Sequence, residues 1–159
     1  MPRNSMRNKI ATLLLLIITL GMVSCDDKTV YHHYEHVPGY VWEKNDTLTF
    51  SIPPVAEEGT YQEQLEMRIN GDYPFLSLTM LVDEHILPLG GSHRYAYTCE
   101  LMDKYATPLG EGVSYYQYRF DMNELNLNKG DSLIVYIVHN MKRELIPGIS
   151  DVGLRLRRK

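Results

Sequence analysis

Apolar and polar residues alternate with a period of two along most of the chain after Asp46. Leu48, Phe50 and Ile52 alternate with hydroxyl side chains, which is the pattern of a strand with one buried face. Similar segments recur between turn residues such as Asn70-Gly71, and helical periodicity is almost absent. The segments that we predict as strands are 47–52, 61–69, 75–82 with an extension to 87, 94–102, 116–121, 132–139 and 152–157.

This series of about seven short strands indicates an all-β fold, a single antiparallel β-sandwich of the immunoglobulin-like or jelly-roll-like kind. An open barrel is the alternative. Residues 132–139 (SLIVYIVH) are apolar at nearly every position, so we expect a central strand that is covered on both faces. We also expect a loop over 103–112 and a single helical turn within 123–128.

The first 24 residues have the features of a secretory signal peptide. Basic residues precede an apolar run over 10–23, and the small residue Ser24 closes it. Cys25 follows, so the segment resembles the lipobox of bacterial lipoproteins, in which the cysteine is diacylated and the peptide is cut before it. An ordinary signal peptide with a chance cysteine is the alternative. A transmembrane anchor would need about 20 apolar residues.

Lipidation of Cys25 would anchor the protein stably, because two or more acyl chains hold where one does not. We therefore divide the chain into a lipoprotein signal peptide (1–24), a lipidated tether and entry segment (25–41) and a β-sandwich domain (42–159). Asp26 and Asp27 follow the cysteine. Such residues resemble an inner-membrane retention signal in enterobacteria and a surface-export signal in Bacteroidetes. We leave the leaflet open and favour the outer membrane over the inner.

Net charge and cysteine content limit the partners. The signal segment holds three of the 16 lysines and arginines and no acid, so the remaining residues carry −7 where the precursor carries −4. An acidic domain repels phosphate backbones, so we expect no nucleic-acid partner. With Cys25 lipidated, Cys99 has no disulfide partner, and its alternating segment favours a buried core thiol.

Three histidines, His32, His33 and His36, suggest a metal site, because i, i+4 spacing places two ligands on one face of a helix. The neighbouring tyrosines and Pro38-Gly39 disfavour a helix there. We therefore predict no metal and no cofactor.

Residues suited to catalysis are sparse. His139 with Asp151 or with Asp103 is a conceivable acid–base pair, but nothing in the sequence fixes the distance between them. Ser114 and Ser150 lie in no nucleophile-elbow pattern, and phosphate-loop and zinc motifs are absent. We predict no enzymatic activity and no small-molecule ligand.

Five stretches carry a family resemblance. They comprise Trp42 with Asp46-Thr47-Leu48 and Phe50; Arg68 with Tyr73-Pro74-Phe75 and Leu78; Asp103 with Gly110 and Gly112; His139 with Met141 and Arg143; and Leu145 with Gly148-Ile149 and Asp151-Val152-Gly153-Leu154. Together with the lipobox they make the chain similar to the gliding-motility lipoproteins of the GldH type found in Bacteroidetes. Ser77, where an asparagine would be expected, and a loop poor in glycine at 103–112 depart from that pattern.

This resemblance implies a membrane-anchored, non-catalytic accessory of the gliding machinery and of the protein-secretion machinery with which it shares components. The expected partners are the membrane, through lipid on Cys25, and envelope proteins. The signature positions Trp42, Asp46, Tyr73, Pro74, His139, Gly148, Asp151 and Gly153 would form either a structural framework or a partner-binding surface. For a structural role, we expect Trp42 to plug one end of the sandwich, Asp46 to hold a turn and both glycines to allow positive φ or close backbone approach.

The alternative function is an envelope lipoprotein whose sandwich binds carbohydrate or peptide. A flat, exposed row of aromatic rings would support it, and inward-facing rings would not. The candidates for such a row are Tyr95, Tyr97, Tyr115, Tyr116 and Tyr118.

Overall fold

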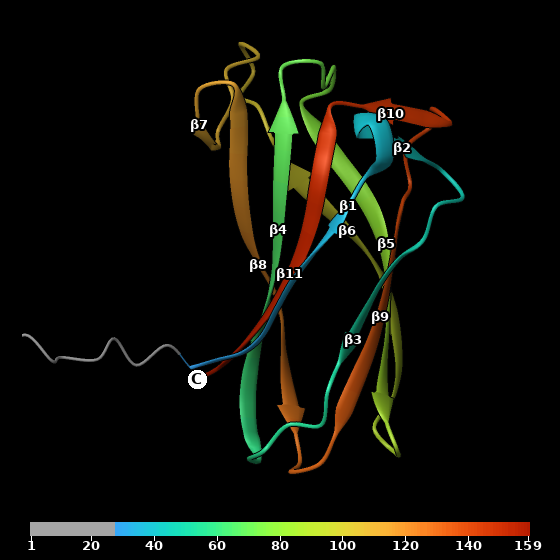
Figure 1. Cartoon of the computed structure of the whole chain (residues 1–159), viewed down its shortest axis with the longest axis vertical. Coiled ribbons are helices and arrows are strands. Elements are labelled where there is room, and N and C mark those ends of the chain that lie inside the picture. The colour runs from blue at the N-terminus through green and yellow to red at the C-terminus, as the bar shows by residue number, and fades with distance from the viewer. Residues whose placement is uncertain (1–27) are drawn as a thin grey trace, which may run out of the picture.

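A computed structural model describes residues 28–159, which form two antiparallel β-sheets packed face to face (Figure 1). The five-stranded sheet has the order β1 (Thr29–His36), β11 (Ile149–Arg158), β4 (Gly59–Asn70), β8 (Tyr115–Leu127) and β7 (Glu111–Gly112). The four-stranded sheet has the order β3 (Leu48–Ile52), β9 (Ser132–His139), β5 (Ser77–Leu87) and β6 (Gly91–Glu100). A small ribbon pairs β2 (Val41–Glu43) with β10 (Leu145–Pro147), and a 3-10 turn, η1 (Pro38–Tyr40), precedes β2.

The connections identify the sandwich as a jelly roll. Six of the seven connections between the eight longer strands cross from one sheet to the other, and only β5 and β6 form a hairpin within a sheet. This alternation gives the two interleaved Greek keys of a jelly roll. It decides between the two sandwich types that the sequence left open. Within residues 28–159, no helix has the length and apolar character needed to cross a membrane.

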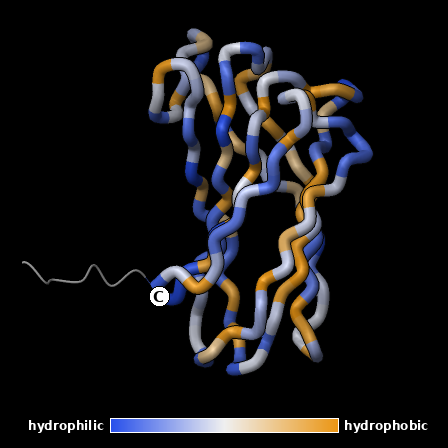
Figure 2. The backbone as a smooth tube through the Cα atoms, viewed as in Figure 1, coloured by the Kyte–Doolittle hydropathy of each residue, from blue (hydrophilic) through white to orange (hydrophobic). Residues whose placement is uncertain are grey.

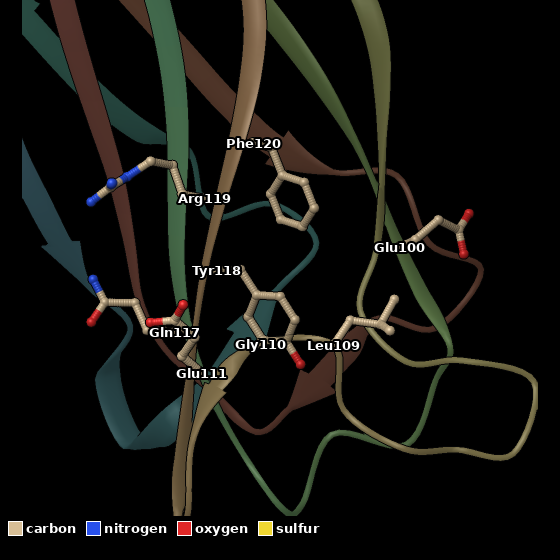
Figure 3. A pocket seen from close by; sticks show the side chains of 8 residues that line it. All are labelled: Glu100, Leu109, Gly110, Glu111, Gln117, Tyr118, Arg119 and Phe120. Carbon is tan, nitrogen blue, oxygen red and sulfur yellow. The ribbon is translucent and has the colours of Figure 1, made fainter.

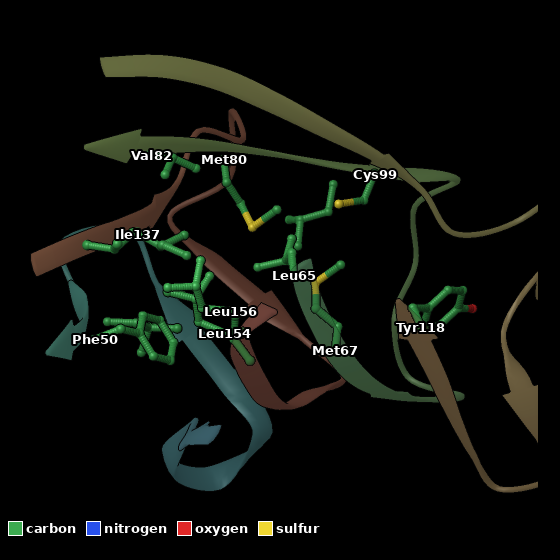
Figure 4. Packing of buried hydrophobic residues seen from close by; sticks show 14 of the residues in the cluster. Phe50, Leu65, Met67, Met80, Val82, Cys99, Tyr118, Ile137, Leu154 and Leu156 are labelled. Atoms are coloured by element: carbon green, nitrogen blue, oxygen red, sulfur yellow. The ribbon is translucent and has the colours of Figure 1, made fainter. Parts of the chain in front are cut away.

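The core lies between the sheets and follows the predicted alternation. In β3, Leu48, Phe50 and Ile52 are buried, whereas Thr49 and Ser51 are exposed. Figure 2 shows the same alternation of hydrophobic and hydrophilic residues along the other strands. Side chains from both sheets interdigitate in Figure 4, where Met80, Val82 and Cys99 face residues of the opposite sheet. Cys99 is fully buried, as its alternating segment predicted.

The predicted domain boundary at Trp42 is wrong, because the sandwich already begins at Thr29. Residues 29–36, expected within a tether, form the edge strand β1 and pair antiparallel with β11. The segment showed no clear period because both of its faces carry tyrosine and histidine side chains. Strands at a sheet edge commonly carry such polar side chains. Cys25 and the signal segment lie outside the described residues.

Two further expectations differ from the structure. Residues 123–127, predicted as a helical turn, continue strand β8 beyond an irregularity in its pairing with β4. Strand β9 is central, between β3 and β5, as predicted. However, its second face is not covered: Tyr136 is exposed, and Ile134 and Val138 are only half-buried. An apolar strand in a sandwich therefore does not require a third layer.

Candidate functional site

The signature residues, which are scattered along the sequence, gather at one end of the sandwich. Strand direction places four connections at this end, which we call the loop end. The opposite end holds three short connections and both ends of the described chain (Figure 1). The connections of the loop end are 37–47, 71–76, 101–114 and 140–148. Five of the eight signature residues lie in them, His139 is the last residue of β9, and Asp151 and Gly153 lie in the first half of β11.

Trp42 is the structural centre of the loop end. Its side chain is fully buried, and its indole N–H donates to the backbone carbonyl of Asp46 at 2.9 Å. The imidazole of His139 meets the indole edge to face, with ring centroids 5.6 Å apart. Asp46 holds the turn through its backbone, since its N–H also donates to the carbonyl of Glu43. Trp42 thus plugs the end of the sandwich, as predicted, and burial lowers the pKa of His139.

Gly148 and Tyr73 join two of the loops. Gly148 has a φ of 87°, and a Cβ atom placed on it would lie 2.4 Å from the backbone nitrogen of Tyr73. Its N–H donates to the carbonyl of Tyr40, and its carbonyl accepts from the N–H of Asn70, both at 2.8 Å. The Tyr73 hydroxyl donates to the Ser77 carbonyl. Pro74 follows at the exposed surface. Both geometric reasons for a glycine, positive φ and close approach, therefore apply at Gly148.

Gly153 serves a different purpose, on the outer face of the five-stranded sheet. The ring of Tyr34 packs against it, and a Cβ atom on Gly153 would be 2.7 Å from that ring. The Tyr34 hydroxyl donates to the carboxylate of Glu66, which is buried although it faces outward. His32 and Arg119 also contact this carboxylate, at 3.1 and 2.8 Å. Gly153 therefore allows an aromatic and ionic cover over the sheet.

The acid–base pairs that the sequence allowed are not formed. Asp151 contacts His36, Ser150 and Arg68. Asp103 accepts from the backbone N–H groups of Tyr105 and Thr107 within its own loop. His139 meets neither carboxylate and instead contacts Trp42 and the Met141 N–H.

The three clustered histidines also point to different places. His32 contacts Glu66, His33 contacts Glu35 and His36 contacts Asp151. Residues 28–159 contain no group of three or more histidine, cysteine, aspartate or glutamate side chains placed to hold a metal ion.

Exposed apolar side chains concentrate at the loop end. Eleven large apolar residues are exposed within the described part of the chain, and seven of them lie at this end. They are Tyr40, Leu76, Tyr105, Leu109, Val113, Tyr115 and Leu145. Such a concentration is typical of interaction surfaces. Sequence reasoning missed it, although apolar residues within turn-rich segments are the signal that would have indicated it.

The tyrosines considered for sugar binding do not form an exposed row. Tyr95, Tyr97 and Tyr116 are half-buried and pack against the core, and Tyr118 is buried. Only Tyr115 of the five is exposed. The observation that would have supported the carbohydrate-binding alternative is therefore missing among these five rings.

A cavity of about 530 Å³ lies between β8 and the loop that carries β7 (Figure 3). Its wall contains the nearly parallel rings of Tyr118 and Phe120, whose centroids are 6.0 Å apart. The loop lies against the Tyr118 ring at Gly110, where a Cβ atom would be only 2.7 Å away. The Tyr118 hydroxyl donates to the carbonyl of Leu101. No serine, cysteine or histidine is among the described residues that line this cavity.

Comparison with known proteins agrees with the signature. The family model described as GldH lipoprotein matches residues 29–156. The gliding motility lipoprotein GldH of Flavobacterium johnsoniae is 28% identical over 159 residues, with 92% of this chain and 95% of that protein covered.

Solved structures are less similar. A family 35 carbohydrate-binding module from Clostridium thermocellum shows 12% identity and a TM-score of 0.41, with 77% of this chain and 86% of that chain covered. The Eiger TNF structure from S. frugiperda shows 8% identity and a TM-score of 0.38, with 83% and 93% covered. Neither similarity carries information about function.

Proposed function

Because the chain belongs to the GldH lipoprotein family, we propose that it is a lipid-anchored accessory of the gliding-motility machinery in the cell envelope. In this role it performs no chemistry and acts by contacting envelope proteins, including components shared with protein secretion. The lipid is carried by Cys25, and the jelly roll presents its loop end to the partner.

The observation that carries this proposal is the shared location of two sets of residues. The buried signature residues hold the loops of the loop end in place from the core side. They are Trp42, Tyr73, His139 and Gly148. The exposed apolar side chains lie on the same loops. A framework that holds apolar loops in fixed positions suits the docking of a protein.

The direction of β1 supports this arrangement. The strand begins at Thr29 and ends at His36, beside the loop end. A strand rises about 3.3 Å per residue, so eight residues span roughly 26 Å. The loop end therefore lies well away from Thr29, the first residue of β1.

Site-specific photo-cross-linking in the native host tests this function. Val113 at the loop end is 89% exposed, and Leu89 at the opposite end is 94% exposed, so they form a matched pair. A photo-reactive residue at position 113 should cross-link to a component of the gliding or secretion machinery, identified by mass spectrometry. The same residue at position 89 should not. Equal cross-linking from both positions, or none from position 113, would contradict the proposal.

A further inference from the structure

Tyr40 adopts a backbone conformation that is unfavourable for its residue type. Its φ is 59°, in the left-handed region, directly after Gly39 with a φ of 63°. For an L-residue other than glycine this region costs free energy. The Tyr40 ring is 42% exposed, so core packing does not explain why a tyrosine occupies the position. Strained residues of this kind cluster at functional sites.

Tyr40 and Tyr115 form an exposed aromatic pair. Tyr115 is 47% exposed, and the two ring centroids are 6.3 Å apart at an angle of 70°. The ring of His36 meets the other side of Tyr40 at 5.9 Å. The backbone of Tyr40 is held at both ends, because its N–H donates to Val37 and its carbonyl accepts from Gly148. The backbone of Tyr40 is therefore held in place, and both tyrosines are open to solvent.

Two carboxylates lie on segments next to this pair. Asp72 lies in the turn just beyond Asn70, which pairs with Tyr115 in the sheet. Glu111 of β7 pairs with Gln117, two residues from Tyr115 along β8. Neither Asp72 nor Glu111 forms an ion pair within residues 28–159. The hydrogen bond with Tyr40 raises the pKa of Tyr115, and the negative charges of Asp72 and Asp151 raise it further.

On the outer face of the five-stranded sheet, one basic side chain already binds between an aromatic ring and a carboxylate. The guanidinium of Arg68 lies 4.4 Å from the centroid of the Tyr34 ring and 3.9 Å from a carboxylate oxygen of Asp151. An aromatic face and a carboxylate together bind a cation through its charge and through the ring quadrupole. Tyr40 and Tyr115 offer the same two elements, with Asp72 and Glu111 as the unpaired carboxylates.

We propose that Tyr40 and Tyr115, with Asp72 and Glu111, bind an arginine or lysine side chain on the protein partner of the loop end. This inference rests on the proposed function and specifies the chemistry of the contact. The occupant follows from charge complementarity, because Asp72 and Glu111 form no ion pair within residues 28–159 and leave negative charge on the segments next to the rings.

The test uses the full-length protein in its host, with the photo-reactive residue at position 113 as readout. Tyr40→Gly removes the ring and suits the left-handed backbone, so the melting temperature should not fall while the cross-link decreases at least tenfold. Asp72→Lys should have the same effect on the cross-link. Tyr40→Phe keeps the ring and should retain it. Tyr136→Ala, at an exposed tyrosine of β9 outside the loop end, is the control and should also retain it.

Soluble probes on isolated envelopes identify the charge that is recognised. Tetra-arginine should compete with the cross-link, whereas tetra-glutamate and maltohexaose should not. Undiminished cross-linking in Tyr40→Gly, or equal competition by tetra-glutamate or the sugar, would overturn this inference and leave the proposed function standing. Absence of the cross-link in the unsubstituted protein would overturn the proposed function itself.

Discussion

Glu63 of β4 and Glu84 of β5 meet inside the sandwich, one from each sheet, and both are completely buried. The hydroxyl of Tyr95 donates to Glu84 and lies 3.4 Å from a carboxylate oxygen of Glu63. Within residues 28–159, one oxygen of each carboxyl group is buried without a hydrogen-bond partner. Burial, and then the charge of Glu84, raises the pKa of Glu63 well above its ordinary value.

This pair predicts that stability decreases as pH rises. The unfolded chain releases the Glu63 proton near pH 4.5, whereas the folded chain keeps it to higher pH. The contribution of Glu63 to the free energy of unfolding is therefore fully present below pH 4.5. It is lost progressively as the pH rises to the pKa of Glu63 in the folded protein. Each unit between the two pKa values costs about 1.4 kcal/mol. Glu63→Gln needs no proton and should flatten the profile, as measured by urea unfolding from pH 4 to pH 9. Exposed Glu57→Gln is the control, and parallel profiles for all three proteins would refute the prediction.

A second prediction compares two glycines with positive φ. Gly148→Ala should lower the free energy of unfolding by more than about 2 kcal/mol, because the new methyl group would collide with the backbone of Tyr73. Gly130 has a φ of 91° but open space around it, so Gly130→Ala should cost only about 1–2 kcal/mol of conformational strain. Chemical denaturation measures both. Equal losses would show that the contact with Tyr73 is unimportant.

The buried thiol of Cys99 gives a third prediction. Burial raises its pKa to about 12, and the thiolate is the reactive form. In the folded protein, Cys99 should therefore resist iodoacetamide at pH 8, and it should react at the rate of a free cysteine in denaturant. Mass spectrometry of the alkylated peptide follows the reaction. Rapid modification under native conditions would contradict the burial of this side chain.

Cys25→Ala is expected to separate anchoring from folding. The variant should leave the membrane fraction, because its acyl chains are missing, while circular dichroism of the released protein still reports a folded β-domain. Carbonate-washed envelopes provide the measurement, with Cys99→Ala as the control that keeps the anchor. A Cys25→Ala protein that still pellets with washed envelopes would refute lipidation as the means of attachment.

The sequence predicted the strands whose two faces differ in polarity. β3 has the expected alternation over its whole length. β1 was not predicted because its outward side chains contact a polar neighbour. They cover the carboxylate of Glu66, which tyrosine and histidine can bind and an apolar residue cannot. The covered second face predicted for β9 was wrong for a related reason. Apolar residues such as Val138 tolerate partial exposure, and composition does not reveal the number of layers.

The loop end could not be assembled from the sequence, because strand order and register are needed to bring Trp42, Tyr73, His139 and Gly148 together. The buried pair was within reach. A period of two places Glu63 in line with Tyr61 and Leu65, and this should have marked a charge inside the core. The left-handed conformation of Tyr40 has no sequence signal, since residue preference alone favours glycine there.

The pairing of β1 with β11 also limits how far the β-sandwich can lie from its lipid anchor. The carbonyl of Lys28 already accepts from the N–H of Arg158, and only Asp26 and Asp27 separate Lys28 from Cys25. An extended chain advances at most about 3.6 Å per residue, so three residues allow roughly 11 Å of slack. A flexible linker from Cys25 to Trp42 would have allowed a separation of about 60 Å between the anchor and the domain. With lipid on Cys25, the β-sandwich would lie close to the bilayer surface. The distance of its far end from the membrane would then be set by the length of the sandwich and not by a linker.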